Sequence, residues 1–100
     1  MLKISVTDGL KLRRLILEGK LIAPWADELK AACDRARGEL DGRDFVVDLK
    51  HLTAISEQGE NVLLELMNEG VRLRSDGVFT KQVLKRLARR IRGNSQEPKR

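Results

Sequence analysis

The stretch "FVVDLKHLTAISEQGENVLLELMNEG", residues 45–70, decides the fold. Its first five residues form a short run that is apolar except for Asp48, which predicts a buried strand. Its second half repeats apolar residues at helical spacing, which predicts a helix from about Glu57 to Glu69 with Gly70 just past its end. The polar residues 56–59 join the two, so they form a strand-to-helix corner.

Two strands are predicted near the N-terminus. "LKISVT", residues 2–7, alternates apolar and polar residues as a half-buried strand does. Asp8-Gly9 follows and predicts a tight hairpin turn, because Gly accepts a positive φ. "LKLRRLILEG", residues 10–19, then predicts a second strand, antiparallel to the first and ending at Gly19.

A helix is predicted between this hairpin and the buried strand. Pro24 opens it, since the missing N–H of proline costs nothing in a first turn, and Gly42 breaks the chain before the strand. The apolar face of this helix is predicted to contain Trp25, Leu29, Ala32, Cys33, Ala36 and Leu40.

The C-terminal part predicts one more strand and one more helix. "VRLRSDG", residues 71–77, alternates as a short strand. "FTKQVLKRLARRIR", residues 79–92, predicts a helix, whereas residues 93–100 lack core-forming side chains and predict a disordered tail. The apolar side of this helix contains Val83, Leu84, Leu87, Ala88 and Ile91. We therefore expect an α/β fold in residues 1–92: a small mixed sheet of about four strands, beginning with a hairpin, with about three helices packed on it.

Composition limits the class of protein. A chain of 100 residues with 41% hydrophobic and 35% charged residues fits one globular domain. Cys33 is the only cysteine, so no intrachain disulfide can form, and a reducing, cytoplasmic setting is expected. The N-terminus does not resemble a signal peptide, and no apolar run approaches the roughly 20 residues that span a bilayer.

Positive charge is concentrated at the C-terminal end. Residues 1–80 hold 12 Lys/Arg and 14 Asp/Glu, whereas residues 81–100 hold 8 Lys/Arg and one Glu. The cations of the predicted last helix form a candidate basic patch: Lys81, Lys85, Arg86, Arg89, Arg90 and Arg92. Such a patch suits an acidic protein partner, nucleic acid or a membrane surface, and it is also what an ordinary solvated helix face looks like.

Few residues offer catalytic or metal chemistry. His51 is the only histidine and is expected in an exposed loop, so no metal site and no metal ligand are predicted. Cys33 is expected to be a small buried apolar residue. Asp48, near the predicted strand end, is either functional by position or a cap for nearby N–H groups. No phosphate-binding Gly-rich loop and no nucleophile–base motif occurs. We therefore predict no catalytic residue, no cofactor and no enzymatic activity.

The pattern as a whole resembles a STAS domain, the fold of bacterial anti-sigma factor antagonists. The resemblance rests on "LILEGKLIAPWADEL" at residues 15–29, "FVVDLKHLTAIS" at residues 45–56, Gly59 and "NVLLELMNEG" at residues 61–70, and it covers roughly residues 3–76. It implies a non-catalytic interaction module whose partner is an anti-sigma kinase-like ATPase or another component of a regulatory complex. STAS subunits of lipid transporter complexes are a further reading that the resemblance leaves open.

The same resemblance implies a role for the corner. The family pattern is Asp-Ser-Ser/Thr-Gly, with the phosphoacceptor just before the Gly, and this chain has Ser56-Glu57-Gln58-Gly59. The acceptor position therefore falls on Gln58, which has no hydroxyl, so the usual phosphoregulation is expected to be absent. A shifted register would make Ser56 or Thr53 the acceptor instead. The predicted partner-binding residues are Asp48, Ser56, Glu57, Gln58 and Gly59.

Local chemistry accounts for part of the corner without any partner. Ser56 is a good N-cap whose oxygen accepts an N–H of residue 58 or 59, and Glu57 is an ordinary acid of a first helical turn. Gly59 is less easily explained, because Gly inside a helix costs roughly 0.5–1 kcal/mol relative to Ala. Close approach of a partner, or of neighbouring backbone, would account for it.

Two further associations remain open at this point. The basic helix favours nucleic acid as an alternative ligand, in which case binding falls steeply with salt. A sheet with an exposed edge strand could also pair with a second copy of the chain to form a homodimer.

Overall fold

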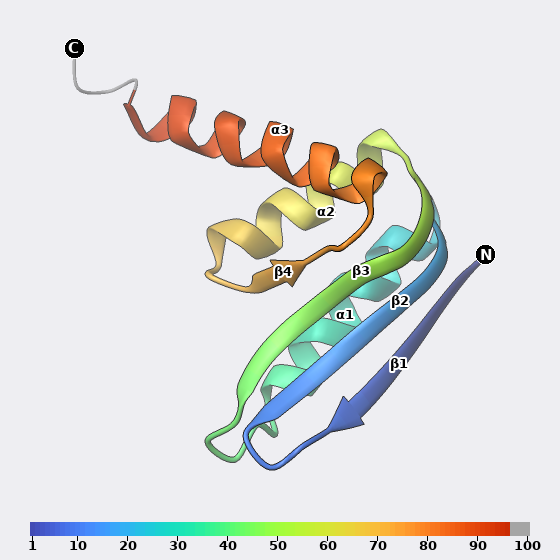
Figure 1. The fold of residues 1–100 in the computed structure, drawn as a ribbon, viewed down its shortest axis with the longest axis vertical. Coiled ribbons are helices and arrows are strands. Elements are labelled where there is room, and N and C mark those ends of the chain that lie inside the picture. The colour runs from blue at the N-terminus through green and yellow to red at the C-terminus, as the bar shows by residue number, and fades with distance from the viewer. Residues whose placement is uncertain (97–100) are drawn as a thin grey trace.

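The fold is that of a computed structural model, which describes residues 1–96 (Figure 1). Three helices and four strands follow one another in the order β-β-α-β-α-β-α. Their bounds are β1 Leu2–Asp8, β2 Leu12–Leu21, α1 Trp25–Arg37, β3 Asp44–Ile55, α2 Glu57–Asn68, β4 Arg72–Arg74 and α3 Val78–Gln96.

The strands form one mixed sheet that begins with a hairpin, as the sequence predicted, and the structure shows their order in the sheet to be β1-β2-β3-β4. The hairpin strands β1 and β2 pair antiparallel, and β2–β3 and β3–β4 pair parallel. The hairpin turn is longer than expected, because Asp8 lies opposite Arg13 and residues 9–12 connect them. The Gly9 N–H donates to the Leu12 carbonyl over 2.8 Å, and Gly9 does not take a positive φ. The prediction of a tight turn made by Asp8-Gly9 is therefore wrong.

Strand β2 does not end at Gly19 but continues to Leu21. Gly19 has a φ of +103°, and a Cβ built there would lie 2.4 Å from the Met1 carbonyl oxygen. The pairing of β2 with β3 shifts register beside it, between Gly19 and Lys20. Gly19 thus allows a local irregularity and a close approach of the chain, while the strand continues.

Helix α1 begins at Trp25 with Pro24 as its N-cap, one residue later than predicted, and it ends at Arg37. Leu40, which we expected on its apolar face, lies beyond the helix and is half-buried. Gly38 occupies the C-cap with a φ of −72°, so the helix has ended before Gly42 is reached. The buried side of α1 is Ala26, Leu29, Ala32, Cys33 and Ala36.

Strand β3 is the longest strand and extends well past the apolar run that predicted it. Its second half pairs with the end of β2, as Gly19 lies beside Leu52 and Leu21 beside Ile55. Two expectations are corrected by this extension. His51 is exposed but lies in a strand, not a loop, and Asp48 lies within the strand, not at its end.

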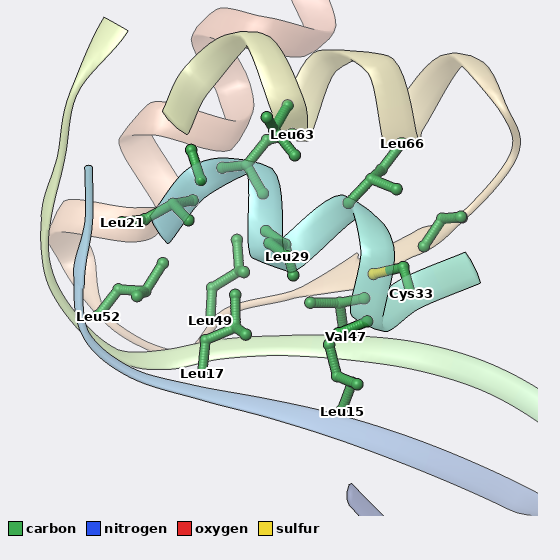
Figure 2. Close-up of a cluster of buried hydrophobic side chains, with 14 of the residues drawn as sticks. Leu15, Leu17, Leu21, Leu29, Cys33, Val47, Leu49, Leu52, Leu63 and Leu66 are labelled. Carbon is green, nitrogen blue, oxygen red and sulfur yellow. The ribbon is translucent and has the colours of Figure 1, made fainter. Parts of the chain in front are cut away.

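A single apolar core joins the sheet to α1 and α2, which lie on the same side of it (Figure 2). Leucines and valines of β2 and β3 point up to meet side chains from both helices. Burial raises the pKa of the Cys33 thiol to about 12, so this residue is the small buried apolar group that was predicted. The labelled core residues are Leu15, Leu17, Leu21, Leu29, Cys33, Val47, Leu49, Leu52, Leu63 and Leu66.

Helix α2 ends as the sequence predicted. Gly70 has a φ of +86° and its N–H donates to the Met67 carbonyl over 3.0 Å. The Val71 N–H donates to the Leu66 carbonyl over 3.0 Å, which completes the left-handed cap. This cap turns the chain sharply into the short strand β4.

Helix α3 begins one residue earlier than predicted and extends to Gln96, four residues past the expected end at Arg92. It packs beside α2 and extends away from the rest of the fold (Figure 1). Residues 97–100, the remainder of the expected tail, lie outside the described residues. The division into a domain of residues 1–92 and a disordered tail of residues 93–100 therefore stays a prediction.

Candidate functional site

The candidate site is the corner where β3 hands over to α2. Ser56 is the N-cap of α2, and its Oγ accepts the Gly59 N–H over 3.2 Å. Its own backbone N–H donates to the Leu21 carbonyl over 3.0 Å. The end of β2 and the start of α2 are thereby tied to one another. The predicted N-cap is confirmed, and the corner lies at the carboxyl ends of two parallel strands.

Gly59 is explained by neighbouring backbone, one of the two reasons considered for it. A Cβ at this position would lie 2.3 Å from the Leu21 carbonyl oxygen and 3.1 Å from Cγ2 of Ile55. A Cβ contact as short as 2.3 Å essentially does not occur in proteins, so only glycine fits here without movement of the neighbouring backbone. Gly59 is also buried, so it shapes the corner from inside and offers little surface to a partner.

Glu57 and Gln58 are the exposed residues of the corner. Both belong to the first turn of α2, where free N–H groups and the helix dipole favour negative charge. Glu57 supplies one such charge and Gln58 supplies an uncharged amide. The corner therefore presents one carboxylate and one amide on a rigid base.

The two candidate hydroxyls have different surroundings. The Thr53 hydroxyl lies in β3 and donates to the Gly19 carbonyl over 3.1 Å. The Ser56 hydroxyl accepts from Gly59, as described above, and is half-buried. Phosphorylation of Ser56 or Thr53 in a shifted register stays a prediction.

Asp48 does not join the corner. It precedes Ser56 by eight residues of extended chain, which is roughly 25 Å along β3 at about 3.3 Å per residue. Its Oδ1 accepts the Lys50 N–H over 2.9 Å, so it caps a nearby backbone group. The register places it between Ile16 of β2 and Arg74 of β4. Asp48 was predicted to belong to the corner because the apolar run ends at Leu49, whereas β3 continues to Ile55.

The predicted basic patch lies on α3, which packs beside α2. Its members Lys81, Lys85, Arg89, Arg90 and Arg92 are exposed. Arg86 is also exposed, but its guanidinium forms an ion pair with Glu60 in the first turn of α2. This ion pair joins α3 to the first turn of α2, a contact that the sequence could not predict.

Two apolar residues at the start of α3 are unexpectedly exposed. Val78 is 75% and Phe79 is 46% exposed. Phe79 precedes Arg86 by seven residues, so helical periodicity puts the two on the same side of α3. The only sequence signal for this exposure is that Phe79 falls outside the apolar side of the predicted helix.

Two other kinds of site are absent from the part of the chain that the structure describes. No three or more His, Cys, Asp or Glu side chains are grouped there so as to hold a metal ion. Within the same residues, no helix has the length and apolar character needed to cross a membrane.

Comparison with known proteins supports the fold. No protein-family model matches the sequence, and no curated protein matches it. An anti-sigma factor antagonist from Mycobacterium paratuberculosis has a similar structure, with a TM-score of 0.67 and 17% identity, over 82% of this chain and 74% of that one. An uncharacterized protein from Shewanella loihica with a SpoIIAA-like fold gives a TM-score of 0.55 at 14% identity, over 79% of this chain and 70% of that one.

The fold is therefore STAS-like, the class to which the predicted sheet and helices pointed. The same fold occurs within a larger chain, because the protein Mglu matches with a TM-score of 0.56 and 21% identity over 73% of this chain but 19% of its own length. At these identities the likeness establishes the fold alone.

Proposed function

We propose that this protein is a non-catalytic interaction module that docks a regulatory protein partner through the β3–α2 corner. The proposed partner class is an anti-sigma kinase-like ATPase or a component of a comparable regulatory complex in the bacterial cytoplasm. The observation that carries this proposal is the construction of the corner: a capped, backbone-tied helix start whose outward groups are Glu57 and Gln58. The similarity in fold to an anti-sigma factor antagonist supports the partner class.

The corner suits docking better than catalysis. It is held by three backbone-based contacts, namely Ser56 N to Leu21 O, Gly59 N to Ser56 Oγ and Glu60 N to Ser56 O over 2.9 Å. A preorganised surface loses little conformational entropy on binding, which favours affinity. The exposed ring of Phe79 adds an apolar anchor of the kind that dominates protein interfaces.

A phosphoswitch at the family position is not part of this proposal. A serine kinase transfers the γ-phosphate to a side-chain hydroxyl that is held in line with it, whereas Gln58 offers only an amide. Glu57 supplies a permanent single charge, whereas a phosphoserine carries about −1.5 to −2. The docking surface is therefore expected to have one constant state.

The test starts from affinity capture with the whole chain, followed by calorimetry with the partner that is identified. Glu57→Lys should weaken binding at least about tenfold, which corresponds to about 1.4 kcal/mol. Glu65→Lys is the matched control, because Glu65 is an exposed acid of the same helix, eight residues further along. Equal loss in both variants would show that overall charge, not the corner, determines binding.

A second candidate function is nucleic-acid binding by α3, which the exposed cations favour. An electrophoretic mobility shift at low and moderate salt tests it. Binding that survives moderate salt and is lost in Lys81→Glu, with the corner variants unaffected, would favour this alternative. Association with a lipid transporter complex is a further alternative, and the identity of the captured protein separates it from a sigma-regulatory pathway.

A further inference from the structure

The apolar side of α3 is wider than the surface that covers it. Val83 and Leu87 are buried, at 4% and 0% exposure. Leu84, Ala88 and Ile91 belong to the same side but are only half-buried. A helix that packs fully in its own domain would bury all five. The side chains of Leu84 and Ala88 are thus only partly covered by the described part of the chain.

This partly covered side of α3 forms one wall of a groove of about 550 Å³. The opposite wall comes from the end of α2, its glycine cap and β4. We call this the α3 groove, and its apolar lining is Leu84, Ala88 and Ile91 on one side and Met67, Gly70, Val71 and Leu73 on the other.

Cations lie along the outer border of the α3 groove. Lys85 and Arg92 line it directly. At about 100° per residue, Lys81 and Arg89 fall on the same border of α3 as Lys85. None of Lys81, Lys85 and Arg89 takes part in an ion pair among those formed by the described residues. The groove therefore combines an apolar floor with a positive edge.

We propose that the α3 groove binds an amphipathic helix of a protein partner, with an apolar stripe facing the floor and Asp or Glu residues beside that stripe. The lining from Leu84 to Ile91 spans eight residues of α3, about 10 Å or two helical turns at a rise of about 1.5 Å per residue. This length suits a partner helix that inserts apolar residues at i, i+3 or i+4, and i+7. Met67 adds a side chain that adapts readily to different apolar shapes.

Charge and shape disfavour the other occupants. A second copy that offered its own α3 would bring cationic borders together, which opposes association. Nucleic acid would pair with the cations but would leave the apolar floor in water. A membrane surface would contact α3, but a flat surface would not fill a groove whose far wall includes Leu73. The α3 groove is a different surface from the β3–α2 corner, so this proposal can be tested independently of the proposed function.

The experiment is a two-dimensional NMR titration of the whole chain with a synthetic peptide. The probe is a capped helical peptide of about 15 residues with Leu at i, i+3 and i+7 and Glu beside them, and a second peptide carries Lys in place of Glu. We expect the acidic peptide to shift the amide signals of Met67, Leu73, Leu84 and Ala88 and to bind at least about tenfold more tightly than the basic peptide.

Matched variants separate the groove from plain charge attraction. Lys85→Glu should weaken binding of the acidic peptide at least about fivefold, whereas Arg90→Glu should weaken it less than about twofold. Both residues are exposed on α3, and helical periodicity puts Arg90 on the side away from the groove. Ala88→Glu should abolish binding, with circular dichroism used to confirm that this variant folds.

Several results would overturn the proposal. One is equal weakening by Lys85→Glu and Arg90→Glu, which would mean attraction to net charge. Another is an absence of shifts in the groove at millimolar peptide. Binding to phosphatidylcholine–phosphatidylglycerol vesicles that Ala88→Glu removes, without peptide binding, would assign the surface to a membrane instead.

Discussion

Replacement of Gly59 by alanine tests the central packing contact of the corner. The added Cβ would lie 2.3 Å from the Leu21 carbonyl oxygen, where an ordinary contact measures 3.4 Å or more. The end of β2 and the start of α2 must therefore separate by about 1 Å. That movement also stretches the hydrogen bonds from Ser56 N to Leu21 O and from Gly59 N to Ser56 Oγ, which measure 3.0 and 3.2 Å.

The size of the effect follows from three contributions. Overpacking costs about 1–3 kcal/mol. Weakening of the two hydrogen bonds adds about 1 kcal/mol. The higher helix propensity of alanine offsets about 1 kcal/mol of this destabilisation. The free energy of unfolding should therefore fall by about 2 kcal/mol, which lowers the melting temperature of a domain of this size by about 8–16 °C.

The assay is thermal and urea unfolding followed by circular dichroism, with Gly38→Ala as the control. Gly38 has a φ of −72°, and a Cβ there would meet its nearest atom, the Arg35 carbonyl oxygen, at 3.5 Å. Gly38→Ala should change the free energy of unfolding by less than about 0.5 kcal/mol. If Gly59→Ala is as stable as the wild type, or more so, the reasoning about the Leu21 contact is wrong.

Three further predictions concern stability and reactivity. Ser56→Ala should lower the free energy of unfolding by about 1 kcal/mol in urea titrations, because the N-cap hydrogen bond to Gly59 is lost, whereas Ser56→Asp should retain most of it. The Cys33 thiol, whose pKa burial raises to about 12, should not react with Ellman's reagent at pH 8 in the folded chain and should react fully in denaturant. Hydrogen bonds from Arg37 and Lys30 lower the pKa of Glu69 below its ordinary value of 4.5, so the folded chain holds this proton less tightly than the unfolded chain. The resulting stabilisation is complete above pH 4.5 and is lost as the pH falls through the pKa of Glu69 in the folded chain. Glu69→Gln should therefore make the free energy of unfolding depend less steeply on pH when it is measured between pH 5 and pH 2.

The features that the sequence predicted correctly are those set by local chemistry. The hydroxyl of Ser56 reaches an N–H three residues away, and Gly70 takes a positive φ that other residues resist. Neither depends on which elements pack together. The apolar periodicities of α1 and α2 gave their positions because one side of each helix had to be buried.

The features that the sequence missed depend on distant parts of the chain. Strand β3 continues past Leu49 because β2 supplies a partner as far as Leu21, although the residues there are more polar. Leu40 was assigned to α1 on spacing alone, yet Gly38 ends the helix first. The ion pair that fixes Arg86 to Glu60 joins residues far apart in sequence, so no local pattern signals it.

Gly59 shows how a shared residue can carry less information about function than its place in a motif implies. It is the one position of the corner that matches the STAS pattern, and packing against Leu21 requires it whether or not a phosphate is ever transferred nearby. The match therefore supports the fold and says nothing about a switch. The residues of the corner that could change without disturbing this packing are the exposed ones, Glu57 and Gln58. Any specialisation of this chain for its own partner should therefore be sought in those two side chains, which is why the binding test changes Glu57 and leaves Gly59 in place.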